Sequence, residues 1–215
     1  MANRSFTVKS FDNFLNDGGL RCGFTLTILK GLCPKKINLF NWLARANKIL
    51  TLEILGLRRC NHYPSITCVL CHANVESADH LLVQCPVVSH IWNFFSQLLD
   101  FRRVPTSLAD QWGAWRKSNK KPLIFLWDLI ARAITWNIWL ERNARIFKST
   151  YCTTVSIIII KIEHMLFLWL SAAPDPKKAK LEEPVAKVKR SLDFLSFADL
   201  TPSVPPEGLP NSGAI

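Results

Sequence analysis

Apolar residues recur at intervals of three and four along most of the chain up to about residue 170, which is the spacing of amphipathic helices rather than of strands. Four segments show this spacing: residues 36–46, 87–99, 123–147 and 155–170. The last segment is rich in β-branched residues, which favour strands, but its length favours a helix. A shorter apolar stretch, residues 24–29, fits a strand or an extended segment. The sequence therefore predicts a mainly α fold.

Capping residues mark where several of these helices begin. Thr51 is a suitable N-cap for a helix over residues 52–57, and Ser77 for a short helix that ends near Gln84. Pro86 comes soon afterwards, and proline is favoured at the first position of a helix. Two helix ends are therefore expected to meet just before Pro86.

The long segment over residues 123–147 carries charges at helical spacing. Asp128 and Arg132 lie four residues apart, as do Glu141 and Arg145, so each pair is expected to form on the exposed side of the helix. The charges also make the segment too polar for the centre of a bilayer, so no membrane span is predicted.

Composition divides the chain into parts. The last part is rich in proline and small polar residues, which is typical of a disordered tail. The expected fold is a small helical module, a helical hairpin and this tail. The predicted parts are an irregular N-terminal segment (1–24), the small module (25–100), a helical region (101–172) and the disordered tail (173–215).

Three cysteines and one histidine lie at the spacing of a metal site. Cys68 and Cys71 form a Cys-x-x-Cys turn, and His80 and Cys85 come within fourteen residues of it. Zn²⁺ takes four tetrahedral ligands from thiolate sulfur and imidazole nitrogen, and this set supplies all four. Because no position is left for water or substrate, the sequence predicts structural rather than catalytic zinc. The small module over residues 25–100 is therefore expected to be a zinc-stabilised, zinc-binding module.

Two other interpretations of these residues remain open. They are either ordinary buried side chains, or Cys68 and Cys71 form a disulfide. The chain begins without the apolar core of a signal peptide, which predicts an intracellular, reducing compartment, the nucleus or the cytoplasm, where thiols stay free for metal. Cys60, His62 and His72 are close enough in sequence to act as substitute ligands.

The chain is strongly basic, with a formal net charge of +11. Residues 1–170 hold 21 Lys or Arg against 10 Asp or Glu, so the excess belongs to the predicted folded part. Such an excess indicates an anionic partner, and nucleic acid is favoured, although adjacent cations are often only a solvated face. Trp112 and Trp115 are expected to pack in a core rather than to stack on bases. The candidate phosphate-binding residues are Lys35, Lys36, Arg58, Arg59, Arg116 and Lys117.

Two sequence runs resemble a known family. They are LCPKKINLFNWLARANKILTLEILGLRRC and CVLCHANVESADHLLVQCPVVSHIW, which include the four candidate ligands, Arg58, Arg59 and Glu76. Together they resemble the zinc-binding region located after the polymerase domain in plant non-LTR (LINE-type) retrotransposon reverse transcriptases. A later run, RAITWNIWLERNARIF, is similar to the segment C-terminal to that region in such elements. The resemblance covers about residues 29–92 and 132–147.

This resemblance implies a zinc module that acts beside a polymerase, with element RNA or target DNA as the nucleic acid. The chain itself holds no paired catalytic aspartates, no glycine-rich phosphate loop and no His-Glu-x-x-His motif, so no catalytic residues are predicted. We therefore expect a non-catalytic, nucleic-acid-binding accessory module, with a reverse transcriptase polymerase domain as a further partner. The alternative is a zinc-stabilised scaffold that binds another protein through its apolar helices.

Overall fold

The computed structural model describes residues 28–29, 31–60, 65–115, 123–147, 153–172 and 186. In this part of the chain the fold is helical, and an isolated antiparallel bridge joins Thr67 to Val75. None of the helices in it is long and apolar enough to cross a membrane. The helices are α3 (Lys35–Arg45), α4 (Leu52–Leu57), the π-helix η1 (His80–Gln84), α5 (Pro86–Leu98), α6 (Leu108–Trp112), α8 (Leu123–Phe147) and α9 (Val155–Ser171).

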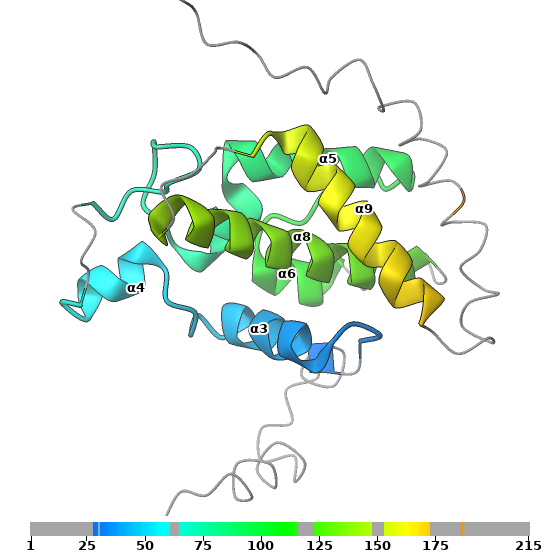
Figure 1. Ribbon diagram of the computed structural model, residues 1–215, viewed down its shortest axis with the longest axis horizontal. Coiled ribbons are helices and arrows are strands. Elements are labelled where there is room, and N and C mark those ends of the chain that lie inside the picture. The colour runs from blue at the N-terminus through cyan, green and yellow to red at the C-terminus, as the bar shows by residue number, and fades with distance from the viewer. Residues whose placement is uncertain are drawn as a thin grey trace, which may run out of the picture.

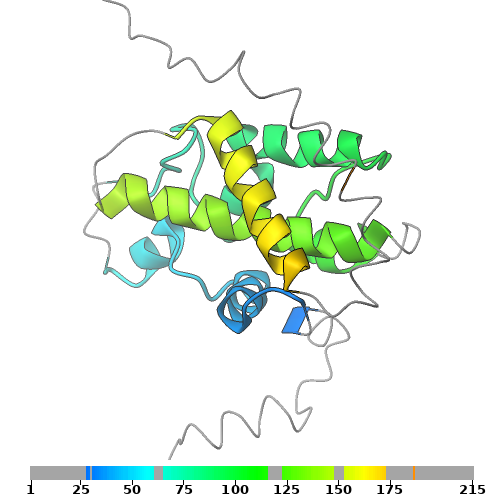
Figure 2. The same ribbon diagram turned by 45° about the vertical axis from the view of Figure 1, so that its right-hand side comes forward.

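The long helix α8 runs through the middle of the molecule, and the other elements surround it (Figure 1). It contacts α3, α5, α9 and η1. Helix α9 crosses α8 on one side, while α3 and α4 lie along the opposite edge from α5, as the turned view also shows (Figure 2). Helix α8 contacts η1 and α5, which come before the predicted domain boundary at residue 100. The boundary itself stays a prediction.

Periodicity and capping predicted the helices closely. Each of the four long helices begins and ends within a residue or so of the predicted segment, and residues 155–170 are helical despite their β-branched content. Thr51 caps α4, because its hydroxyl oxygen accepts a hydrogen bond from the amide of Ile54 at 3.4 Å. Ile28 and Leu29, predicted as strand or extended, are helical; residues 24–27 and the predicted tail lie outside the described residues.

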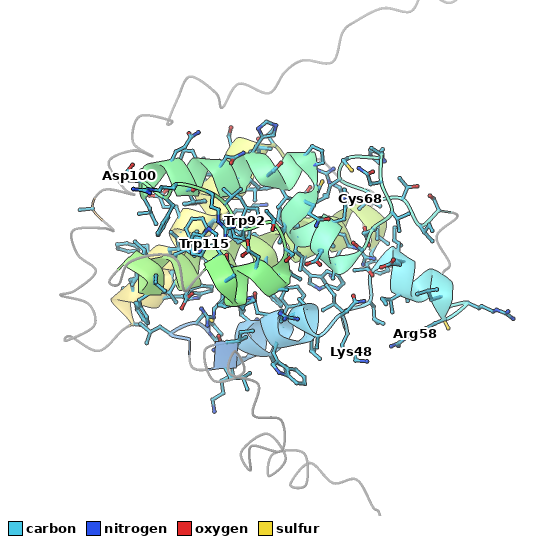
Figure 3. All side chains as sticks on the ribbon, turned by 180° about the vertical axis from the view of Figure 1, so that it is seen from behind. Lys48, Arg58, Cys68, Trp92, Asp100 and Trp115 are labelled. Carbon is cyan, nitrogen blue, oxygen red and sulfur yellow. The ribbon has the colours of Figure 1, made fainter. Side chains whose placement is uncertain are left out.

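Aromatic side chains fill the space between α5, α6 and α8. The rings of Trp115 and Trp127 stack with centroids 4.7 Å apart, and Phe101 packs edge-on against both. Trp92 packs against Trp127 from α5, at 5.5 Å. Figure 3 shows Trp92 and Trp115 in the interior rather than on the surface. Trp112 and Trp115 are buried, as predicted, and neither ring is available to stack on a base.

The charged residues of α8 are not where the sequence placed them. Asp128, Arg132 and Glu141 are all buried, so the prediction that they lie on the exposed side was wrong. Glu141 does pair with Arg145, at 2.9 Å, as expected. Arg132 donates to the backbone carbonyl of Asp128. The i,i+4 spacing correctly predicted which residues are near each other on α8. Whether these residues are buried or exposed depends on partners that are distant in the sequence.

Those partners lie on the side of α8 that faces α3. Arg132 donates through Nε to Oδ1 of Asn38 at 2.9 Å and through Nη2 to the carbonyl of Ile28 at 3.1 Å. One turn further on, the hydroxyl of Thr135 donates to Oδ1 of Asn41 at 2.9 Å. Buried polar groups are stabilising only when they are paired in this way, so these contacts set the position of α3 along α8.

Candidate metal centre

The first two candidate ligands lie on the turn Cys68–Cys71, which backbone hydrogen bonds hold in place. The amide of Cys68 donates to the carbonyl of Asn74 at 2.7 Å, and the amide of His72 donates back to the carbonyl of Cys68 at 2.8 Å. His72 has a φ of 55°, in the left-handed region that lets a chain reverse direction within one residue. The turn therefore presents two sulfurs on the same side.

The other two ligands lie at the ends of η1. Ser77 caps the segment as predicted, because its hydroxyl accepts a hydrogen bond from the amide of His80 at 3.1 Å. The amide of Cys85 then donates to the carbonyl of His80 at 2.7 Å, which is the five-residue spacing of a π-helix. In an α-helix, residues five apart point about 140° apart around the axis. The wider turn brings Cys85 back towards His80.

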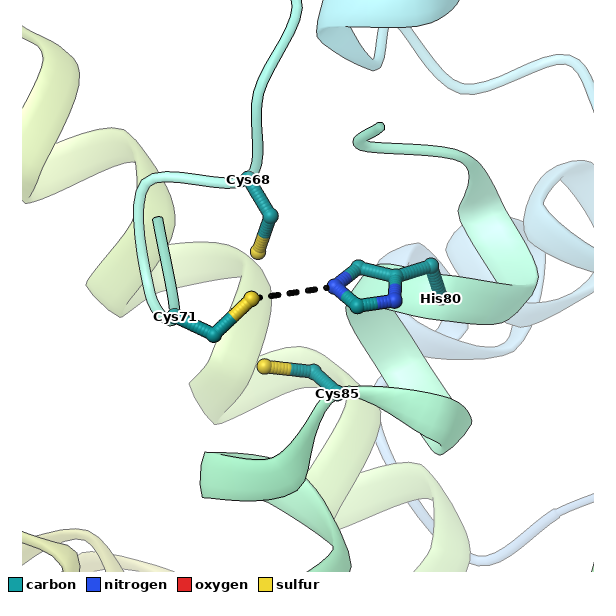
Figure 4. Close-up of side chains that lie close together, drawn as sticks. All are labelled: Cys68, Cys71, His80 and Cys85. Carbon is teal, nitrogen blue, oxygen red and sulfur yellow. Dashed lines mark hydrogen bonds between the residues drawn. The ribbon is translucent and has the colours of Figure 1, made fainter. Parts of the chain in front are cut away.

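All four side chains converge on one point (Figure 4). The sulfurs of Cys68, Cys71 and Cys85 and a ring nitrogen of His80 all lie within 4.8 Å of one another. Sγ of Cys71 approaches Nε2 of His80 to 3.3 Å. Cys68, His80 and Cys85 are buried and Cys71 is partly exposed. The described cysteines are free thiols, so the disulfide interpretation is wrong.

This geometry fits Zn²⁺. With Zn–S bonds of about 2.3 Å and Zn–N bonds of about 2.0 Å, a tetrahedral ion holds its ligand atoms about 3.5–3.8 Å apart. The four atoms here lie within 4.8 Å of one another, and Cys71 and His80 are 3.3 Å apart, so movements of about 1 Å or less would bring all of them to those separations. Three thiolates and one imidazole fill the coordination shell of the ion and leave no position for substrate. The zinc is therefore structural.

The protonation of the ligands also favours a cation. Burial lowers the pKa of His80, with Glu76 opposing the shift, so the ring is in its neutral, metal-binding form near neutral pH. A hydrogen bond from Cys68 lowers the pKa of Cys85, assisted by backbone N–H groups at the start of α5. The same bond, together with burial, raises the pKa of Cys68. A bound cation therefore takes the place of the proton that these two sulfurs share.

Comparison with known families finds one similarity. Residues 6–92 match the family model described as zinc-binding in reverse transcriptase. This part of the chain is similar to the zinc-binding region of a reverse transcriptase. The match names the zinc-binding part of such an enzyme and not its polymerase. No curated protein and no solved structure matches the chain.

The zinc-binding region is tied to α8 by a buried ion pair that sequence reasoning did not predict. Oε1 of Glu76 accepts from Arg142 at 2.8 and 3.0 Å and from the amide of Leu52 at 2.9 Å. The side chains of Glu76 and Arg142 are 0% and 2% exposed. The guanidinium also donates to the carbonyl of Leu50 at 3.2 Å. One carboxylate therefore joins α4, the ligand segment and α8.

A second arginine of α8 reaches the cysteine turn directly. Arg145 donates to the carbonyl of Val69 at 3.2 Å, between the first two ligands, while Glu141 holds the same guanidinium from the other side. Glu141 also accepts from the amide of Thr153, which ties the start of α9 to this corner. The signal in the sequence was the later run of family resemblance, which contains both Arg142 and Arg145.

The remaining predicted site residues lie apart from the zinc ligands. Cys60 is exposed, and its thiol donates to the carbonyl of Arg58. His72 is exposed and its backbone turns away from the cluster, so neither belongs to the ligand set. His62 lies outside the described residues. Of the predicted phosphate-binding residues, Lys35, Lys36, Arg58 and Arg59 are exposed, and Arg116 and Lys117 lie outside the described residues.

Proposed function

We propose that this protein is a non-catalytic, zinc-stabilised module that binds nucleic acid along the edge formed by α3 and α4, hereafter the basic edge. The observation that carries the proposal is the charge of this edge. Residues 31–60 hold six Lys or Arg and a single acidic residue, Glu53. Such an imbalance on an exposed surface attracts phosphate through counterion release, without any need for base contacts. The cations are Lys35, Lys36, Arg45, Lys48, Arg58 and Arg59.

The placement of these cations supports a continuous surface. Lys35 and Lys36 are at the start of α3, and Lys48 and Arg58 lie at the other end of the edge, where both are at the surface (Figure 3). Arg59 has a φ of 55° directly after the end of α4, a position where glycine is the favoured residue. An arginine in this left-handed conformation, where glycine would be less strained, supports a role for the arginine side chain. The C-terminus of a helix also favours a cation.

The zinc site has a positioning role in this proposal. The basic edge is held to the ligand segment through Glu76, which accepts hydrogen bonds from α4 and from α8. The ion would fix the segment that contains Glu76, and Glu76 fixes α4. We further propose that the module derives from a LINE-type element, that RNA or DNA of such an element is its ligand, and that a reverse transcriptase polymerase domain is a partner. The nucleus or the cytoplasm, both reducing, would suit its thiolate ligands.

A salt titration tests the nucleic-acid proposal. Binding of the full chain to a single-stranded RNA and to a DNA duplex is measured by fluorescence anisotropy at several salt concentrations. The slope of log K against log salt is negative. For each phosphate contact that is lost, its magnitude is expected to fall by about 0.9 on duplex DNA and by about 0.7 on single strands. A quadruple variant, Lys35→Gln, Lys36→Gln, Arg58→Gln and Arg59→Gln, should weaken binding and flatten this slope.

The double variant Arg58→Gln with Arg59→Gln removes two charges from the basic edge, and its matched control, Arg102→Gln with Lys161→Gln, removes two exposed cations elsewhere. The control should keep most of the parent's affinity and slope. Equal losses in both variants would show only a general effect of net charge, and would refute the assignment to the basic edge. Circular dichroism and zinc content of each variant establish that the fold is retained.

A protein-binding scaffold is the second candidate, and one observation favours it. Apolar side chains are exposed at the end of α4 and on the two segments that flank the cysteine turn: Leu57 is 76% exposed, Ile66 43% and Val75 45%. Small exposed apolar groups of this kind contribute to protein interfaces when they are contiguous. Binding through them would change little with salt, and it would be lost on Leu57→Ser with Ile66→Ser rather than on removal of the cations.

A further inference from the structure

Helix α9 is apolar on two sides. Its inner side packs against α8 and α5 and consists of Ile158, Ile159, Ile162, Leu166, Trp169 and Leu170, all buried. Its outer side exposes Ile157 and Ile160, each 37% exposed, and Phe167 and Leu168, at 56% and 52%. These four residues, hereafter the outer face of α9, recur at helical spacing. A helix that is apolar on all sides is normally buried on all sides. We therefore expect another segment or another protein to cover the outer face of α9.

The chain itself provides a candidate directly after this helix. Helix α9 ends at Ser171, and residues 173–215 come after it, outside the described residues except for Ala186. That stretch is mostly proline, charged and small residues, and its only aromatic side chains are Phe194 and Phe197. Both belong to the segment SLDFLSFADL, residues 191–200, hereafter the tail segment.

Five of the ten residues of the tail segment are large and apolar. At 3.6 residues per turn, its aromatic residues share one side with Leu195 and Ala198. Ser196 falls on the opposite side with Leu192 and Leu200, and Asp193 and Asp199 lie at the two borders between the sides. A helix of about ten residues is not stable alone in water, because nucleation is unfavourable and too few hydrogen bonds form afterwards to offset it. The pattern is therefore useful only against an apolar surface.

Charge and reach both match the tail segment to the outer face of α9. The segment carries two aspartates and no cation, and Lys161 and His164 are exposed between the apolar residues of the outer face. Residues 173–190 can extend to about 60 Å. Helix α9, with 17 residues, is about 26 Å long, so the tail segment reaches every part of it.

The other apolar stretch outside the described residues is a poorer match. Residues 11–15 contain two phenylalanines and a leucine, but they are fewer than the residues of the tail segment and carry one aspartate, Asp12, where the tail segment carries two. They also fall within residues 6–92, which match the family model.

We propose that the tail segment folds back onto the outer face of α9, with Phe194 and Phe197 over Phe167 and Leu168 and its aspartates next to Lys161. A tethered segment of this kind acts at an effective concentration in the millimolar range, so even weak contacts keep it bound. The tail segment thereby competes with any other protein for this face. Release of the tail would expose the apolar outer face of α9.

Photo-crosslinking tests the contact in the full chain. p-Benzoylphenylalanine is introduced in place of Leu168, and unlabelled chains are mixed with ¹⁵N-labelled chains before irradiation. The expected product joins position 168 to a peptide within residues 191–200 of the same chain. A crosslink between labelled and unlabelled chains would instead identify a second copy as the occupant. That result, a crosslink to residues 1–27, or no crosslink at all, would overturn the proposal.

Hydroxyl-radical footprinting gives an independent measure that does not depend on the crosslinker. In Phe194→Ser with Phe197→Ser, oxidation of Phe167 is expected to rise several-fold, because the covering rings are gone. The matched control, Val204→Ser with Leu209→Ser, removes two apolar residues from the same tail and should react like the parent. Equal oxidation of Phe167 in the parent and both variants would mean that the face is open, and the tail segment would not be its occupant.

Discussion

At the scale of single residues, Glu76 connects the metal site to the rest of the fold. Its carboxylate is fully buried and accepts from the backbone of α4 and from the guanidinium of Arg142. Breaking a buried pair leaves one charge without a partner, whereas breaking an exposed pair leaves both in water. The two kinds of pair in this molecule are therefore expected to differ strongly.

Glu76→Gln removes the negative charge and leaves Arg142 buried. We expect a loss of about 3–5 kcal/mol in the free energy of unfolding, measured by urea denaturation of the zinc-loaded protein. The control is Arg103→Gln, which breaks the ion pair to Asp110; the Arg103 side chain is 47% exposed. This control should cost less than about 1 kcal/mol. Similar losses in the two variants would argue against a central role for Glu76.

At the scale of elements, η1 depends on its cap and on its unusual turn. Ser77 satisfies the amide of His80, so the cap and a zinc ligand share one residue. Thr154 caps α9 in the same way, through the amide of Ile157 at 3.4 Å, but far along the chain from any ligand. The two caps are chemically alike and differ in whether metal binding depends on them.

Ser77→Ala is expected to weaken zinc binding about fivefold, because a lost N-cap costs about 1 kcal/mol and here that energy opposes the metal-bound conformation. Thr154→Ala should cost similar stability and leave the zinc Kd unchanged. Competition with a chromophoric chelator measures both affinities. If the two variants bind zinc equally well, the cap of η1 has no part in positioning His80.

Sequence patterns predicted the helices better than they predicted the burial of polar residues on them. Periodicity was enough for α8, because this signal is local. The buried partners of Arg132 and Arg142 lie 94 and 66 residues away, so no local rule identifies them. The ligand set was predictable because its spacing is short, whereas the π-turn of η1 was not, because it depends on packing and on hydrogen bonds to the next helix.

At the scale of the whole molecule, the zinc site and the aromatic core are physically connected. The indole N–H of Trp92 donates to the carbonyl of Leu82 in η1 at 2.9 Å, and its ring packs on Trp127 in α8. A change in η1 therefore alters the surroundings of a buried tryptophan. Structural zinc contributes about 10–16 kcal/mol in small modules, as much as the whole stability of most domains.

Chelation of zinc is therefore expected to lower the melting temperature and to shift tryptophan emission to longer wavelength, as Trp92 meets water. Cys85→Ser should behave like the chelated protein, with less than one zinc per chain by mass spectrometry of metals. Cys60→Ser, which changes an exposed cysteine outside the ligand set, should retain one zinc and melt like the parent. A Cys85→Ser protein with full zinc content would disprove the ligand assignment.

The two arginines that α8 extends towards the metal site have a practical consequence for dissecting this protein. A fragment that stops at Trp92, where the family match ends, would retain all four metal ligands but lose Arg142 and Arg145. The buried carboxylate of Glu76 would then lack its positive partner. The Cys68–Cys71 turn would lose the arginine that covers one side of it, and that side would be open to water. Excised modules of this type should therefore be cut beyond Phe147, even where sequence similarity ends much earlier.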